Sequence, residues 1–195
     1  MEFETEAAGG RIFFTSDNHF FHGNILQYCN RPFHNLEKMA ETLIENYIKT
    51  VNKNDLCIWL GDITIKRDSL NKEKIKNIIT YLPGKKILIK GNHDYYSDEF
   101  YKECGFINIL DKIISKDFVI IHDPKRMGQF RSNEKKYYLH GHMHYNSPSP
   151  YRDKFDMWMN NKNVYDVGVD ANHFAPVSLS QIKKFFKERE KGFKI

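Results

Sequence analysis

Residues 85–94 read KKILIKGNHD, an apolar run that passes directly into a polar loop. The run has the length and the branched apolar side chains of a buried strand, and a Pro-Gly pair stops the segment before it. Residues 55–62, DLCIWLGD, show the same pattern of an apolar run that ends in polar residues. Residues 11–16, RIFFTS, form a third apolar run, which is followed by Asp17. These stretches predict three strands whose ends carry polar side chains.

Amphipathic segments separate the predicted strands. Residues 36–52 place apolar side chains at helical spacing, and Asn35 precedes them as a candidate N-cap. Residues 69–82 also have a helical pattern. Alternating strands and helices are typical of a partly parallel sheet.

The second half of the chain is richer in strands. We expect consecutive strands within residues 107–124 and further ones in residues 137–144 and 163–170. A last helix is predicted to begin near Ser178, where Ser-x-x-Gln fits a capping box. The pattern therefore predicts an α/β fold with two β-layers.

The domain organisation is expected to be simple. Residues 1–10 are acidic at the start, end in Gly-Gly and lack periodicity, so we interpret them as a flexible leader or cloning remnant. Residues 11–195 are expected to form a single domain, with surface loops at 127–136 and 145–162.

Composition excludes several classes of protein. The three cysteines (Cys29, Cys57 and Cys104) have no CxxC spacing, which argues against a disulfide framework and a thiolate zinc site. No apolar stretch approaches the ~20 residues of a membrane span, and the N-terminus has no apolar signal segment, so we expect a cytoplasmic protein. The net charge of +5 suits an anionic substrate but identifies no partner.

Polar side chains follow each of five predicted strands. In open α/β sheets, sites lie at the carboxyl ends of the strands, so these side chains are expected to converge. The residues are Asp17, His19, Asp62, Asn92, His93, Asp94, His122, His142 and His144. Carboxylate, amide and imidazole ligands without thiolate suit manganese, iron or zinc. There are enough ligands here for two ions that share a bridging carboxylate, the arrangement that supports phosphoryl transfer.

The ordered motifs resemble those of the calcineurin-like metallophosphoesterases, in particular small bacterial and phage members. They are D-x-H (17–19), G-D (61–62), G-N-H-D (91–94), the strand-end His122 and G-H-x-H (141–144). The resemblance implies a four-layer α/β/β/α sandwich of two mixed β-sheets flanked by helices. It also implies a dinuclear metal site, with manganese favoured and iron, zinc or nickel as alternatives.

The resemblance also implies residue roles. One ion would be held by Asp17, His19 and His144, the other by Asn92, His122 and His142, with Asp62 between them. His93 would protonate the leaving oxygen or stabilise the transition state, oriented by Asp94. The substrate-contact candidates are His22, Arg31, Asn172 and His173. Their alternatives are structural: a turn for Arg31 and a surface loop for the last two. His140 is more simply structural, and Asp123 receives no role.

These observations predict a metal-dependent phosphoesterase, with a small nucleotide-type phosphodiester favoured as substrate. The alternatives are a phosphomonoesterase, a nuclease of the same superfamily, or a non-catalytic scaffold on this fold. Nucleic acid is not favoured as a partner, because the lysines are spread over helix-like segments and form no dense basic stripe. No membrane partner is expected, and the oligomeric state is not predicted.

Overall fold

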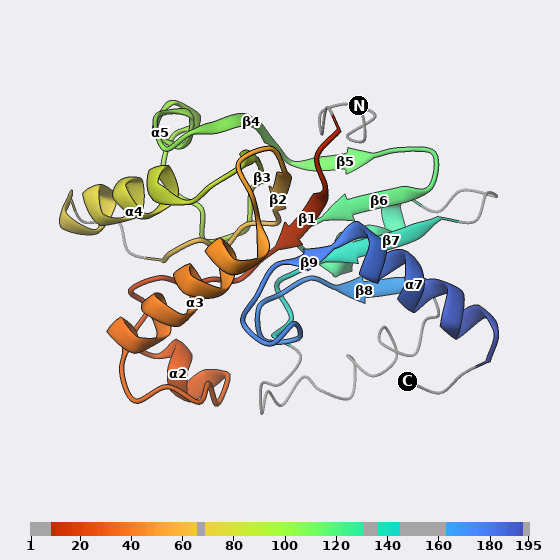
Figure 1. Cartoon of the computed structure of the whole chain (residues 1–195), viewed down its shortest axis with the longest axis horizontal. Helices are drawn as coiled ribbons and strands as arrows, with labels where there is room; N and C mark the ends of the chain where they lie inside the picture. The colour runs from red at the N-terminus through yellow and green to blue at the C-terminus, as the bar shows by residue number, and fades with distance from the viewer. Residues whose placement is uncertain (1–8, 66–68, 131–135, 145–162, 193–195) are drawn as a thin grey trace.

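The computed structural model describes residues 9–65, 69–130, 136–144 and 163–192. Two β-sheets lie at its centre (Figure 1). The first has the strand order β4-β3-β2-β1-β9, and its strands are β1 (Ile12–Thr15), β2 (Leu56–Trp59), β3 (Lys85–Ile89), β4 (Phe106–Leu110) and β9 (Val177–Ser178). The second has the order β5-β6-β7-β8, and its strands are β5 (Lys112–Ile114), β6 (Phe118–Ile121), β7 (Tyr137–His140) and β8 (Val164–Asp166).

Both sheets are mixed. Strands β1 to β4 pair in parallel and β9 pairs antiparallel with β1. In the second sheet β5 is antiparallel to β6, whereas β6, β7 and β8 are parallel. The parallel strands in each sheet end at a common edge, and this edge receives the polar loops.

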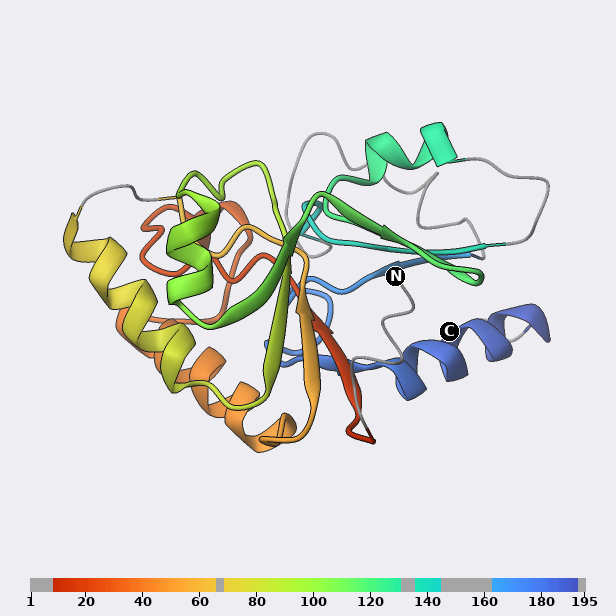
Figure 2. The ribbon, with the colours of Figure 1, turned by 90° about the horizontal axis from the view of Figure 1, so that it is seen from above.

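Helices flank the sheets. They are α2 (Ile25–Tyr28), α3 (Leu36–Thr50), α4 (Ser69–Tyr81), α5 (Asp98–Glu103), the 3-10 helix η1 (Pro124–Phe130) and α7 (Leu179–Glu190). Helices α3, α4 and α5 lie together on one side of the first sheet, and η1 lies over the second sheet (Figure 2). The predicted α/β architecture of two mixed sheets flanked by helices is confirmed.

Two apolar cores explain why the central strands are apolar on both faces. In β2, Cys57 and Trp59 pack toward α3, α4 and α5, whereas Leu56 and Ile58 pack into the core between the sheets. A parallel strand covered on both faces is expected to be continuously apolar. Helix α7 joins the inter-sheet core through residues such as Phe186.

The predicted helix starts are confirmed by their caps. The Asn35 side chain accepts a hydrogen bond from the Lys38 backbone N–H, and Ser178 and Gln181 form the expected capping box. Helix α5 was not predicted, because its sequence DEFYKE is short and mostly polar. It is stabilised by the Ser97 N-cap and by burial of two adjacent aromatic side chains.

Several predicted segments differ from the structure or lie beyond it. Residues 127–130 belong to η1 and not to a surface loop. Residues 1–8, 131–135 and 145–162, which include most of the predicted leader and loops, lie outside the described residues. Among the helices that the structure describes, none has the length and apolar composition needed to cross a membrane.

Candidate metal centre

Backbone contacts join the loops that follow the parallel strands. The Asp17 and His19 backbone N–H groups donate to the carbonyls of Gly61 and Asp62, both at 3.0 Å. The Asp17 carboxylate in turn accepts from the backbone N–H of His142, at 2.9 Å to Oδ2. Loops from both sheets therefore meet at one edge, as their polar side chains predicted.

These contacts assemble two groups of metal-ligand atoms. Asp17, His19 and His144 form the first group, and their nearest ligand atoms lie within 4.8 Å of one another. The Nε2 atoms of His19 and His144 are 3.2 Å apart. The second group is Asp62, His122 and His142, also within 4.8 Å. Asn92 joins it, because its Oδ1 is 3.0 Å from His122 Nε2.

Asp62 lies between the two groups. Its Oδ2 atom is 3.6 Å from His19 Nε2 in the first group and 3.4 Å from His122 Nε2 in the second. All seven predicted ligands are thus brought together, and the Asp62 carboxylate lies between the two groups. The donor set of carboxylate, imidazole and amide fits two divalent ions of borderline-to-hard character.

The ligand backbone is strained. Five of the seven ligands have a positive backbone φ, which is uncommon for residues other than glycine. They are Asp17 (59°), His19 (49°), Asp62 (55°), His142 (74°) and His144 (48°). Such conformations cost of order 1–3 kcal/mol each and cluster at functional sites. This concentration in three loops, those after β1, β2 and β7, indicates that the fold holds these side chains for a purpose other than stability.

Two motif glycines permit close approach of the loops. A Cβ on Gly91 would lie 2.2 Å from Asp62 Oδ1, and a Cβ on Gly141 would lie 2.6 Å from Asp17 Oδ2. No side chain fits at either position without displacing a ligand. The glycines of G-N-H-D and G-H-x-H are therefore required by the packing of the carboxylates.

Burial and mutual charge perturb the ligand pKa values. Burial raises the pKa of Asp17 to about 6. Burial acts against the charge on His122, but the hydrogen bond with Asp62 and the charge of Asp17 outweigh it and raise its pKa to about 9. Burial alone would raise the pKa of Asp62. The hydrogen bond and charge of His122 and the charge of His19 outweigh burial and hold this pKa well below its usual range. Burial, with the charge of His122, lowers the pKa of His142 to about 4.

His93 lies at the edge of this cluster. Its backbone N–H donates to Asp62 Oδ1 at 2.9 Å, and its ring centroid is 5.6 Å from that of His19. Its Nδ1 atom is 3.2 Å from the hydroxyl of Tyr95. The imidazole therefore lies beside the ligands, and its described side-chain partner is a tyrosine.

Asp94 has a different position from the one predicted. Its buried carboxylate accepts backbone N–H groups from Gly91 and Asp62 at 2.8 Å each and from Ile63 at 3.1 Å. Burial raises its pKa. The prediction that Asp94 orients the His93 ring is therefore corrected: these contacts fix the backbone of two ligand-bearing loops.

Arg31 is also placed differently from its prediction as a phosphate contact. Its side chain is 0% exposed. Its three nitrogens donate to both Asp170 carboxylate oxygens, the carbonyls of Asp17 and Asn18, and the sulfur of Met39. All five guanidinium N–H groups are thereby engaged, so none is available to a phosphate in this conformation.

The other substrate-contact candidates differ in position. Asn172 closes the turn after β8: its amide donates to the carbonyls of Asp166 and Gly168 and accepts from the Tyr165 hydroxyl. His173 is exposed beside it. His22 lies close to the ligands, with its ring centroid 5.3 Å from that of His19. The structure thus brings only His22 of these three into described contact with a ligand ring.

The sequence interpretation missed one residue of the cluster, Asp170. Its Oδ2 atom is 2.7 Å from His144 Nδ1, and both of its oxygens accept from Arg31. The Cys29 thiol also lies within 4.8 Å of ligand atoms of His144 and Asp170. Because Arg31 occupies the Asp170 oxygens, we do not assign this third group as a metal site. The strand-end position of Asp170 was a signal that could have identified it.

His140 is not part of either ligand group. It is buried on β7, and its Nδ1 lies 2.8 Å from the carbonyl of the next residue, Gly141. This placement agrees with its structural interpretation.

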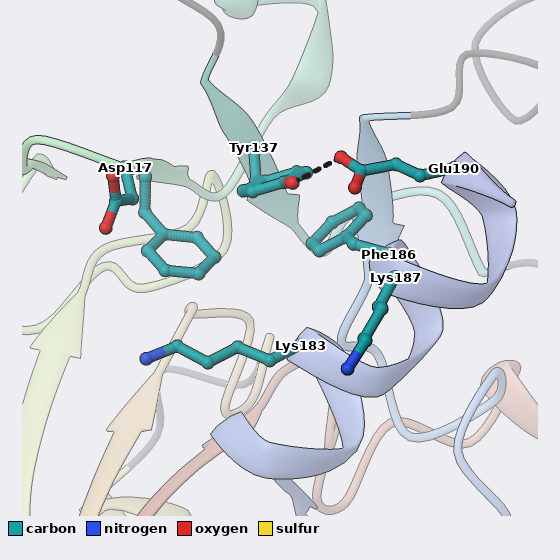
Figure 3. A pocket seen from close by; sticks show the side chains of 7 residues that line it. Asp117, Tyr137, Lys183, Phe186, Lys187 and Glu190 are labelled. Atoms are coloured by element: carbon teal, nitrogen blue, oxygen red, sulfur yellow. Dashed lines mark hydrogen bonds between the residues drawn. The ribbon is translucent and has the colours of Figure 1, made fainter.

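A separate cavity of about 220 Å³ lies at the other end of the second sheet. Asp117 and Tyr137, at the starts of β6 and β7, line it together with side chains of α7 (Figure 3). Tyr137 stacks on Phe186 and donates a hydrogen bond to Glu190 at 2.6 Å. Because β6 and β7 are parallel and carry the ligands at their other ends, this cavity is separate from the metal centre and belongs to the docking of α7.

Comparison with known proteins identifies the family. The model of the calcineurin-like phosphoesterases matches residues 10–191, so the chain belongs to this family, as its motifs predicted. Membership indicates a hydrolase of phosphate esters that binds divalent metals.

Two relatives match about nine-tenths of this chain, and neither has an established function. The uncharacterised protein MJ1445 of Methanocaldococcus jannaschii is 31% identical over 178 residues, which cover 91% of this chain and 92% of the relative. The crystal structure of AQ665, a protein of unknown function from Aquifex aeolicus, has a TM-score of 0.68 and 25% identity, and the match covers 90% of this chain and 99% of AQ665. The nuclease MPE of Pseudomonas putida is more distant, with a TM-score of 0.46, 17% identity, and coverage of 68% and 60%.

Proposed function

We propose that the protein is a dinuclear metal-dependent phosphodiesterase that hydrolyses a small nucleotide-type ester. The observation that carries this proposal is the position of Asp62, whose Oδ2 atom lies within 3.6 Å of an imidazole nitrogen from each ligand group. A carboxylate between two imidazole-rich groups is the arrangement expected for a shared ligand. Manganese remains the favoured metal, with iron, zinc or nickel as alternatives.

In this proposal each ligand group binds one metal ion. Asp17, His19 and His144 would hold one ion, and Asn92, His122 and His142 the other, with Asp62 contributing to both. Two such ions would lower the pKa of bound water and stabilise the charge that develops in the transition state of phosphoryl transfer. The chain itself supplies the geometry, because the strained loop backbone fixes the direction of five of the seven ligands.

His93 is proposed as the general acid. Its half-buried ring is adjacent to His19, while its Nδ1 faces the Tyr95 hydroxyl. Nε2 is then the nitrogen left to deliver a proton to the departing oxygen of the ester. General-acid assistance of this kind contributes roughly 10²–10⁴-fold to the rate.

Exposed aromatic side chains favour a nucleotide-type substrate. Tyr95 is 47% exposed and packs edge-on against His93, and Tyr28 is 59% exposed and packs edge-on against His22. Both histidine rings are within 5.6 Å of the ligand ring of His19, measured between centroids. Exposed tyrosines beside a phosphoesterase site can stack on a base, a contact worth ≈ 1–3 kcal/mol. A phosphomonoester remains the alternative substrate class.

The test is a hydrolysis screen of the metal-loaded protein, with bis-aryl phosphodiester and cyclic nucleotides set against an aryl monoester. Asp62→Asn should weaken binding of both ions and abolish turnover, whereas Asp17→Asn should weaken only one ion. Metal content after gel filtration distinguishes the two variants. Selective turnover of the monoester would reject the phosphodiesterase assignment, and two ions retained by Asp62→Asn would reject its bridging role.

A further inference from the structure

The second ring nitrogen of His144 is held by a carboxylate. Asp170 Oδ2 lies 2.7 Å from His144 Nδ1, on the side away from the other ligands. His144 Nε2 meanwhile lies 3.2 Å from His19 Nε2 and 3.9 Å from Asp17 Oδ1. A metal-binding histidine commonly donates its other N–H to a carboxylate, which fixes its tautomer and raises its basicity. Asp170 thus leaves Nε2 as the ligand atom.

Arg31 holds Asp170 in place through a fork-like pair. Its Nε and Nη2 atoms donate to the two Asp170 oxygens, each at 2.8 Å, and both side chains are buried. Nη2 also donates to the carbonyl of Asp17 at 2.7 Å. One guanidinium therefore connects the carboxylate behind one ligand, His144, to the backbone of another, Asp17. Both ligands belong to the first group.

The second ligand group has no equivalent contact among those described. His122 Nδ1 is held by the backbone carbonyl of Leu60, which carries no charge. The two groups therefore differ in what supports them: a buried ion pair behind His144 and a neutral peptide group behind His122. A buried ion pair is weak evidence for stability, because desolvation offsets much of its attraction. A role in fixing ligand geometry explains its presence here better.

We propose that Asp170 and Arg31 are positioning residues that build the first metal position, the one formed by Asp17, His19 and His144. They act on the orientation and basicity of His144 and on the loop that carries Asp17, and touch neither the substrate nor the ion. This inference rests on the proposed two-ion centre and goes beyond it, since it assigns a separate support to one ion.

The experiment compares metal-free wild-type protein with Asp170→Asn and Arg31→Lys by calorimetric titration with Mn²⁺. Wild type should bind two ions. In Asp170→Asn, and by the same mechanism in Arg31→Lys, one ion should bind about 10–100-fold more weakly while the other keeps its affinity. The electron paramagnetic resonance signal of a coupled manganese pair should then give way to that of a single ion at low metal concentration.

Asp55→Asn is the matched control. Asp55 is also buried and accepts from an arginine, Arg11, but it lies at the start of β2, at the opposite end of the sheet. This variant should lose stability and still bind two ions as wild type does. A purely structural role for Asp170 would make its variant behave in the same way.

The outcomes separate the inference from the proposed function. If wild type itself binds fewer than two ions, the proposed centre fails. If wild type binds two ions, the centre stands. The assignment of Asp170 and Arg31 is then overturned if both variants bind the two ions with unchanged affinity, or if both variants lose the two ions equally. Circular dichroism of the metal-free proteins shows whether Asp170→Asn is folded. If it is not, Arg31→Lys, which keeps a cation beside Asp170 but cannot reproduce the fork, decides the question.

Discussion

The carboxylate of Asp94 accepts a hydrogen bond from the backbone N–H of Asp62 at 2.8 Å. The same carboxylate accepts from Gly91, within its own loop, and from Ile63. A side chain in the loop after β3 therefore determines the backbone path of the loop after β2. The position of Asp62, the proposed bridging ligand, therefore depends on a residue that does not itself belong to the proposed ligand set.

Asp94→Asn should consequently affect both stability and metal binding. An amide offers one acceptor oxygen in place of two, so at least one buried N–H donor loses its partner, at a cost of about 1–3 kcal/mol per unsatisfied group. We expect a lower free energy of unfolding in urea and weaker binding of both ions. Asp98→Asn is the control, because Asp98 is 50% exposed in its pair with Lys90 and such pairs contribute little. A fully stable but inactive Asp94→Asn protein would instead support a direct action on His93.

His93→Ala should lose turnover and keep its metals. Removing the proposed general acid is expected to lower kcat by roughly 10²–10⁴-fold, while calorimetry still shows two bound ions. Tyr95→Phe removes only the hydroxyl beside His93 Nδ1 and should have a smaller effect on kcat. Tyr81→Phe, at an exposed tyrosine on α4, provides the control and should match wild type. Loss of an ion from His93→Ala would place His93 among the ligands.

Gly91→Ala tests whether the loops need their close approach. The added Cβ would lie 2.2 Å from Asp62 Oδ1 and 2.6 Å from the Asp62 backbone nitrogen, so the loop must move. We expect destabilisation together with loss of metal affinity. Gly23→Ala is a matched control, since a Cβ there meets nothing within 4 Å. Equal stability and metal content in the two variants would show that the loop shifts without consequence.

Metal binding should become stronger as the pH rises from about 6 to about 9. In the metal-free protein His122 has a pKa of about 9, so over this range it carries a proton that a metal ion must displace. The raised pKa of His122 also stabilises the folded state of the metal-free protein. This contribution is fully present below the pKa of His122 in the unfolded chain, about 6.5, and is lost as the pH rises through about 9. Stability of the metal-free protein should therefore fall over the range in which affinity rises.

Calorimetry in buffers of different ionisation enthalpy measures the number of protons released by metal binding at pH 7.5. Protons are expected from both His122 and His144, because hydrogen bonds with Asp62 and Asp170 outweigh burial and raise the pKa of each imidazole. His34→Gln, a change at an exposed histidine, should leave this number unchanged. Metal binding that releases no proton would contradict the assignment of His122 as a protonated group in the metal-free site.

Most strands and the three longest helices, α3, α4 and α7, could be predicted from the sequence because their signals are local. Helix α7 begins where Ser178 and Gln181 form their capping box, and the apolar runs before Asp17, Asp62 and Asn92 are strands. The nine candidate residues followed from the same argument, since polar groups at the ends of parallel strands converge, whereas the choice of seven ligands among them rested on the family resemblance. Helix α5 was missed, because its stability comes from packing of Phe100 and Tyr101 more than from its own pattern.

The supporting contacts of the site could not be predicted in the same way. Arg31 and Asp170 are 139 residues apart, and neither position signals that the other will be its partner. The role of Asp94 was misassigned because its motif places it next to His93, whereas its side chain turns toward backbone groups of other segments. Such contacts depend on backbone conformations, including the left-handed ones of Asp17 and Asp62, that side-chain patterns do not encode.

The position of Asp62 between the two ligand groups has a consequence for how the proposed centre would fill. In the proposed two-ion centre, Asp62 would be shared, so the first ion bound would offset its charge and a second ion would meet a changed site. By thermodynamic linkage, the factor by which one ion alters the affinity for its neighbour is the same in both directions. The affinity of each position therefore depends on whether the other position is occupied. The population of half-filled protein at a given free metal concentration would then depend on both affinities and on the coupling between them.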